Sequence, residues 1–131
     1  MFTRKVVLMI ALGLTCGSAM AEWTALTFSE QIVVYVDKAT IRKSGNMSKI
    51  WILIDSKTSG LSIMGKPYLS IKSRNEFDCN EEKSRILSYT YLSKHMGYGE
   101  VITTNSNPQE WREIDPESVE RDMFNLACDK Q

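Results

Sequence analysis

Short runs of apolar, β-branched and aromatic residues dominate the chain between residues 22 and 104, with turn-forming residues between them. Runs of about four to eight such residues are typical of β-strands rather than helices. The predicted strands span residues 23–28, 33–37, 50–55, 68–79, 83–92 and 101–104. Lys43-Ser44-Gly45-Asn46 has the composition of a tight turn, because glycine and asparagine tolerate positive φ. We therefore expect the second and third strands to pair antiparallel.

Two of these segments alternate between apolar and polar residues, which predicts one buried and one solvated face. In 68–79 the apolar face carries Leu69, Ile71, Phe77 and Cys79. The polar face carries Lys72, Arg74, Glu76 and Asp78. In 83–92 one face is predicted to hold Leu87, Tyr89 and Tyr91, and the other Ile86, Ser88, Thr90 and Leu92. Residues 80–82 form a reversal between the two, and the polar stretch 56–66 is predicted to be a mobile loop.

The C-terminal segment changes to helical periodicity. Its apolar residues recur at helical spacing and are Val119, Met123, Leu126 and Ala127. Asp115 precedes Pro116, which suits the first turn of a helix, so one helix is predicted over residues 116–128. Strands followed by a helix indicate an α+β domain, an antiparallel sheet of about six strands with one C-terminal helix packed on it.

The first 21 residues have the features of an export signal. Arg4 and Lys5 give a positive start, residues 6–14 are apolar, and a small-residue pattern ends at Ala21. We expect cleavage between Ala21 and Glu22, which divides the chain into a signal peptide (1–21) and a single domain (22–131).

A lipid anchor on Cys16 is the alternative reading of this N-terminus. Lipidation signals usually place a branched apolar residue and a small residue before the cysteine, where this chain has Gly13 and Thr15. The apolar run is also shorter than the about 20 residues that span a bilayer, so no membrane-spanning segment is expected. The predicted location is the periplasm or the cell surface of a Gram-negative bacterium.

Cleavage would leave two cysteines, Cys79 and Cys128, in an oxidising compartment. Cys79 ends a predicted strand and Cys128 ends the predicted helix, so a disulfide would tether the helix to the sheet. Closing a loop of 49 residues would stabilise the fold by roughly 4 kcal/mol. The alternatives are two free thiols or a redox-active pair, although redox pairs usually lie close in sequence.

Charge is balanced overall but uneven along the chain. The sequence has 16 basic and 16 acidic residues and no polybasic run, so nucleic-acid binding has no electrostatic support. Residues 38–94 contain 11 basic and 5 acidic residues, whereas residues 110–131 contain 7 acidic and 3 basic ones. Two readings remain open: solvated strand faces with an acidic helix, or a basic sheet surface that faces an acidic partner.

Catalytic chemistry finds little support in the residue pattern. His95 is the only histidine, and no Gly-x-Ser-x-Gly motif is present. A single imidazole falls short of the three or four ligands of a typical metal site, so neither metal nor cofactor is expected. Aromatic residues are better candidates for binding, because they dominate interface energetics. They are Trp51, Trp111, Tyr89 and Tyr91.

Several short motifs follow one another along the chain after residue 21. They are Glu22-Trp23, Val36-Asp37, Thr40-Ile41-Arg42, Ile50-Trp51, Gly65-Lys66-Pro67-Tyr68-Leu69-Ser70, Glu76-Phe77-Asp78-Cys79, Met96-Gly97-Tyr98-Gly99, Glu110-Trp111-Arg112 and Ala127-Cys128. In this order the chain resembles the surface-adhesin protein E family of small exported bacterial proteins. The resemblance implies an antiparallel sheet with a C-terminal helix tethered by a disulfide. It also implies adhesion, because the family takes its name from an adhesin for host matrix and serum proteins.

These observations predict an exported, non-enzymatic binding protein that makes an adhesin-like contact at the bacterial cell surface. The expected partner is a protein or an anionic glycan. The candidate contact residues are Lys72, Arg74, Arg85, Tyr89 and Tyr91.

Two other functions stay open. One is a periplasmic structural or accessory protein with a bacterial partner. The other is a small-ligand carrier with a cavity between helix and sheet, lined by residues such as Leu69, Ile71 and Met123. Edge strands also offer a route to a homodimer.

Overall fold

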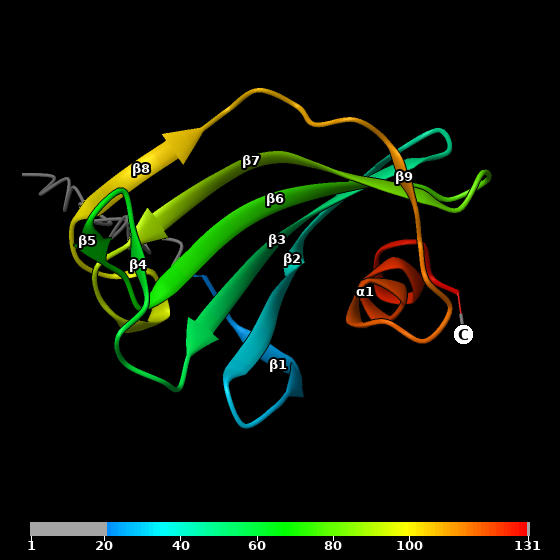
Figure 1. The fold of residues 1–131 in the computed structure, drawn as a ribbon. Coiled ribbons are helices and arrows are strands. Elements are labelled where there is room, and N and C mark those ends of the chain that lie inside the picture. The colour runs from blue at the N-terminus through cyan, green and yellow to red at the C-terminus, as the bar shows by residue number, and fades with distance from the viewer. Residues whose placement is uncertain (1–20, 131) are drawn as a thin grey trace, which may run out of the picture.

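The computed structural model describes residues 21–130, which form one twisted antiparallel sheet with a helix on one face (Figure 1). The strands of the main sheet are β1 (Thr24–Phe28), β2 (Ile32–Ser44), β3 (Met47–Ser56), β6 (Ser70–Asp78), β7 (Lys83–Leu92) and β8 (Val101–Asn105). They lie in the order β1-β2-β3-β6-β7-β8, and the short strand β9 (Arg112–Glu113) also pairs with β7. The helix is α1 (Val119–Ala127). The predicted α+β fold is confirmed, with β9 as an addition.

The sheet has two faces and two ends, which are named here by what lies on them. The helix face carries α1, and the open face is the opposite one. The hairpin end holds the β2–β3 and β6–β7 turns, and α1 lies there (Figure 1). The loop end holds the connecting segments 29–31, 57–69 and 93–100.

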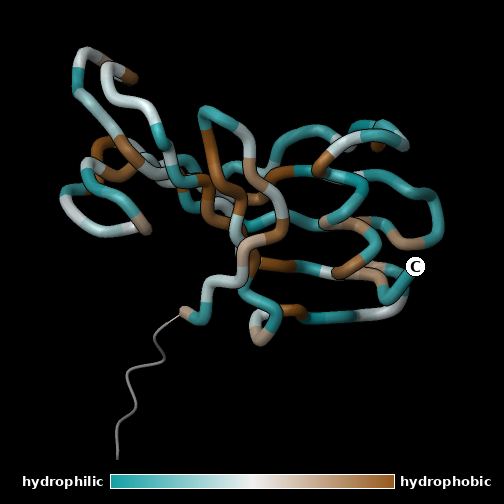
Figure 2. Tube along the Cα trace, turned by 90° about the horizontal axis from the view of Figure 1, so that it is seen from below, coloured by the Kyte–Doolittle hydropathy of each residue, from teal (hydrophilic) through white to brown (hydrophobic). Residues whose placement is uncertain are grey.

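The hydrophobic core lies between α1 and the helix face. Its fully or almost fully buried residues are Val34, Val36, Ile50, Ile52, Phe77, Ile114, Met123, Phe124 and Ala127. Phe77 and Phe124 meet edge to face, with ring centres 6.1 Å apart. Figure 2 shows hydrophobic and hydrophilic stretches following one another along the described chain.

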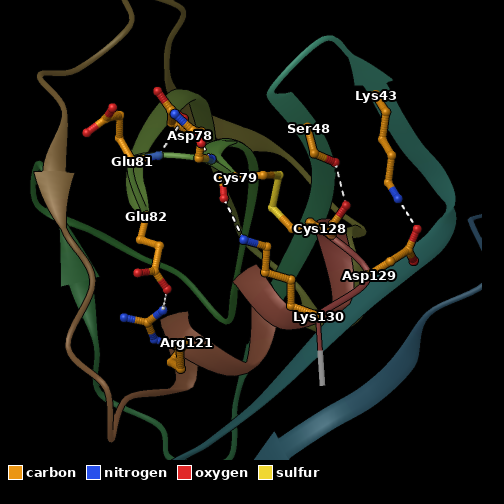
Figure 3. Close-up of a disulfide and its surroundings, with 12 residues drawn as sticks. Lys43, Ser48, Asp78, Cys79, Glu81, Glu82, Arg121, Cys128, Asp129 and Lys130 are labelled. Carbon is orange, nitrogen blue, oxygen red and sulfur yellow. Dashed lines mark hydrogen bonds and ion pairs between the residues drawn. A yellow bond between two sulfur atoms is a disulfide. The ribbon is translucent and has the colours of Figure 1, made fainter.

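Cys79 and Cys128 form the predicted disulfide, with their Cα atoms 5.7 Å apart (Figure 3). Polar contacts surround it: Ser48 Oγ donates to the Ala127 carbonyl at 2.7 Å, and Lys130 Nζ donates to the Cys79 carbonyl at 2.8 Å. The C-terminal end of α1 is therefore held on the sheet by one covalent bond and by two hydrogen bonds, of which the one from Ser48 satisfies the Ala127 carbonyl at the helix end.

The helix begins later than predicted, at Val119 instead of Pro116. Asp115 was expected to lead into it, but its carboxylate accepts the Glu117 N–H at 3.0 Å and forms a separate turn. Ser118 is the N-cap, because its hydroxyl accepts the Arg121 N–H at 3.2 Å.

Two other sequence predictions need correction. Residues 56–66 were expected to be a mobile loop. Instead, β4 (Ser62–Ile63) and β5 (Lys66–Pro67), two strands of two residues each, pair there as a small antiparallel hairpin. The single alternation predicted for 83–92 is also wrong, because the register shifts so that Arg74 pairs with Ser88 and Asn75 with Ile86. This β-bulge leaves Leu87 unpaired and brings Ile86 to the helix face.

The predicted signal peptide lies outside the described residues except for Ala21, and so does Cys16. Within residues 21–130, no helix is long and apolar enough to cross a bilayer. The edge strands of the main sheet are β1 and β8, and pairing between copies through them stays a prediction.

Removing the disulfide tests how much the fold depends on it. We expect the Cys79→Ser/Cys128→Ser variant to lose roughly 4 kcal/mol of unfolding free energy, because the unfolded chain is no longer constrained. Urea unfolding of the oxidised wild type and the variant measures the difference. Reductant should shift the wild type toward the variant and leave the variant unchanged; equal midpoints for all samples would contradict this prediction.

Candidate functional site

The structure divides the five predicted contact residues between the two faces of the sheet. Lys72, Arg74 and Arg85 lie on the open face, where Arg74 pairs with Ser88 and Arg85 with Glu76 across β6 and β7. Tyr89 pairs with Ser73 and Tyr91 with Ile71, so both tyrosines lie on the helix face. The predicted set is therefore not one surface, and the two groups need separate treatment.

The tyrosines form a cluster with Tyr68 on the part of the helix face nearest the loop end. The ring of Tyr91 lies 4.9 Å from that of Tyr68 and 5.8 Å from that of Tyr89, both edge to face. Burial raises the pKa of the Tyr91 hydroxyl, and the two neighbouring tyrosines raise it further. The three rings contact one another, so their clustering has a structural explanation that requires no ligand.

Cations lie against aromatic rings along the open face. Lys72 Nζ is 4.9 Å and the Arg74 guanidinium 6.0 Å from the centre of the Trp51 ring. The Arg85 guanidinium lies 4.5 Å from the centre of the Trp111 ring. Such pairs are worth about 0.5–1 kcal/mol at exposed sites. This row of cations and indoles is the chemistry that most distinguishes the open face.

Glu76 was predicted to be solvated, and this is wrong. It does lie on the polar face of β6, but only 6% of its surface is exposed. Its carboxylate is 2.7 Å from the Arg85 guanidinium and 3.9 Å from Lys49 Nζ, and these long side chains cover it. A buried carboxylate needs such partners, and here they neutralise it, so the outward-facing charge of this region stays positive.

A wide bulge in β2 shapes the open face beside Trp51. Asp37 pairs with Trp51 and Arg42 with Lys49, so residues 38–41 stand opposite the single residue between them on β3. The Thr40 hydroxyl replaces the lost backbone partner: it accepts the Trp51 N–H at 3.0 Å and donates to the Asp37 carbonyl at 2.6 Å. The bulge thus opens the surface without leaving this backbone donor unsatisfied.

Three hollows lie along the open face, and we call them together the groove. The first, of about 510 Å³, is lined by Glu22, Trp23, Asp37, Ala39, Thr40, Arg42, Trp51 and Lys72, and by Ala21, the last residue of the predicted signal peptide. The second, of about 450 Å³, is lined by Ala21, Trp23, Lys72, Met96, Gly97 and Tyr98. The third, of about 260 Å³, is lined by Arg42, Lys43, Ser44, Met47, Lys49, Arg74 and Glu76. The first two fall within the size range of ligand sites.

The space between helix and sheet, in contrast, is filled. Phe77 and Ala127 are completely buried there, and Phe124 is 1% exposed. Neither the three hollows of the groove nor a fourth one beside Asn125 and Leu126 is lined by Leu69, Ile71 or Met123. This packing argues against a small-ligand carrier of the expected kind.

The sequence model of the surface-adhesin protein E family matches residues 23–129. The chain belongs to this family. The matched range covers nearly the whole described domain, including both cysteines and every strand of the main sheet. No curated protein sequence matches the chain at a significant level.

Solved structures of Haemophilus influenzae protein E share the fold. One is 9% identical and matches with a TM-score of 0.65, covering 84% of this chain and 86% of that one. A second crystal form is also 9% identical, with a TM-score of 0.61 over 73% of this chain and 80% of that one. Protein E from a non-typeable strain is 10% identical, with a TM-score of 0.61 over 82% and 74%. At these identities the likeness establishes the fold alone.

Some groove residues of this family member were not among the predicted contacts. Trp23 was predicted to begin a strand, and Arg42 lay between a predicted strand and a predicted turn. A usable signal was the change in pattern after residue 36, where the apolar run of residues 33–36 gives way to Asp37, Lys38, Ala39 and Thr40. The sequence does not show that this segment forms a bulge beside Trp51, because that depends on the register of β3.

The raised pKa of Tyr91 has a measurable consequence. At pH values below 10.0, the ordinary pKa of tyrosine, Tyr91 is protonated in both the folded and the unfolded chain, and the free energy of unfolding keeps its full value. As pH rises above 10.0, the unfolded chain ionises first. The free energy of unfolding therefore falls until the pH passes the raised pKa of the folded state. Tyr91→Phe should therefore weaken the alkaline loss of stability. Denaturant unfolding in a pH series across this value measures it.

Tyr98→Phe is the matched control, because Tyr98 is 61% exposed. It should keep the alkaline slope of the wild type. The same slope in both variants would contradict the pKa assignment of Tyr91.

Proposed function

We propose that the protein is exported to the bacterial cell surface and acts there as a non-enzymatic adhesin that contacts a macromolecular partner through its open face. Membership in the surface-adhesin protein E family supports the general role. The observation that carries the choice of surface is the Trp51 ring with two cations against it, Lys72 and Arg74.

Both cations are available to a partner. Ion pairs occur elsewhere within residues 21–130, but Lys72 and Arg74 take part in none of them. Tryptophan and arginine are enriched among the residues that dominate binding energy at interfaces. A tryptophan with two cations packed against its ring on a sheet can therefore act as an anchor without rearranging first.

The charge of the open face can be tested directly. We expect Lys72→Glu/Arg74→Glu to weaken retention on immobilised extracellular-matrix proteins by about tenfold or more, since reversed charges repel an acidic partner. The control is Lys57→Glu/Lys94→Glu, which makes the same charge change at the loop end. Equal loss in both variants, or no retention of the wild type at low salt, would contradict the proposal.

Surface labelling of intact cells tests the location separately. A cell-surface adhesin is labelled in intact cells, whereas a periplasmic accessory protein is labelled only after the outer membrane is opened. Labelling only after the outer membrane is opened would indicate a periplasmic protein whose open face contacts a bacterial partner.

A further inference from the structure

The three hollows of the groove adjoin one another along the open face instead of forming separate sites. Trp23 and Lys72 line both the first and the second hollow, and Arg42 lines both the first and the third. The groove runs from Tyr98 near the loop end to Lys49 near the hairpin end. Along β6, Lys72 and Glu76 alone are about 13 Å apart at the usual strand rise. Its length suits an extended ligand better than a compact one.

Aromatic surface recurs along the groove. Trp23 and Trp51 are partly exposed and line the first hollow, and Tyr98, which is 61% exposed, lines the second. Aromatic rings provide flat apolar surfaces with little conformational freedom. The C–H face of a sugar ring has the matching shape and polarity, whereas its hydroxyl groups point to the ring edge. An extended ligand made of sugar rings therefore fits this recurrence.

The charges of the groove favour an anion. Its cationic side chains are Arg42, Lys49, Lys72 and Arg74. Lys43 also lines the third hollow, but its ammonium pairs with Asp129 beside the end of α1. The acidic side chains are Glu76, which Arg85 and Lys49 neutralise, Asp37, which accepts the Ala39 N–H at 3.1 Å, and Glu22 at one rim. Asp37 is 5% exposed and Glu76 6%, so both lie beneath the surface that a ligand would meet. The outer surface is positive along most of the groove.

We propose that the groove binds a linear anionic polysaccharide, with sugar rings on Trp51 and Trp23 and carboxylate or sulfate groups on Lys72, Arg74 and Arg42. This inference rests on the proposed adhesin function and goes further by naming the class of ligand. The β2 bulge is part of the site, because two of its residues, Ala39 and Thr40, line the first hollow. The ligand follows the groove lengthwise, with the aromatic rings in the first and second hollows and cations in all three.

Binding of three polysaccharides to the exported protein tests this proposal. The probes are heparin, which is sulfated, hyaluronan, which is carboxylated, and dextran, which is uncharged; tryptophan fluorescence and calorimetry report binding. We expect binding to one or both anionic chains, none to dextran, and affinity that falls as salt rises. Which of the two binds identifies the anionic group.

Variants separate ring stacking from charge. Trp51→Ala leaves every charge in place and should weaken binding about tenfold, the equivalent of about 1.4 kcal/mol. Trp51→Phe should retain most of the affinity. Lys72→Glu/Arg74→Glu should weaken binding at least as much as Trp51→Ala, whereas Lys57→Glu/Lys94→Glu should match the wild type. Thermal unfolding confirms that each variant is folded.

Four results would overturn the proposal. Equal affinity of Trp51→Ala and wild type would exclude ring stacking, and equal losses in both charge-reversal pairs would indicate unspecific attraction. Binding to matrix protein stripped of its glycans, without binding to either polysaccharide, would assign the open face to a protein partner and leave the adhesin function standing. Binding to none of these probes would contradict both proposals.

Discussion

The attachment of one short helix to one end of one face is the constraint on which the rest of this structure depends. Helix α1 has nine residues, and isolated helices of this length are unstable in water. The disulfide to Cys79, the hydrogen bond from Ser48 and the contact between Phe77 and Phe124 hold it in place. The helix in turn buries the apolar positions of β2, β3 and β6. One face of the sheet thereby becomes core, and the other must be stabilised without a second layer.

On the open face, a loop and long side chains take the place of a second layer. At the loop end, Leu53 is completely buried, and the segment 93–100 folds over this region through hydrogen bonds from Met96 to Asp55 and from Gly97 to Ser70. Toward the hairpin end, lysine and arginine stems lie over apolar and acidic groups and leave their charged ends in water. The cations that shield the open face are therefore the same groups that give it binding chemistry.

Sequence patterns predicted what depends on local periodicity and failed where neighbouring strands decide. The strands, the helix and the disulfide follow from alternation, helical spacing and two cysteines. The burial of Glu76 depends on Arg85 and Lys49 meeting it from adjacent strands, which no local pattern shows. The division of the candidate site has the same origin: alternation put Tyr89 and Lys72 on separate strands, but only the register shows that they lie on opposite faces.

The β2 bulge explains why the open face has a groove where a regular sheet would have a flat basic surface. In a regular strand, every residue from Asp37 to Arg42 would pair with β3 in turn, and the Trp51 ring would lie on a flat surface. The bulge moves the backbone aside, and the Thr40 hydroxyl satisfies the Trp51 N–H, so the hollow is formed by hydrogen-bonded backbone. A shape fixed in this way exists before the ligand arrives, and binding does not have to order it. Charge alone attracts many anions, and the fixed hollow beside Trp51 allows the site to select one with a ring to stack.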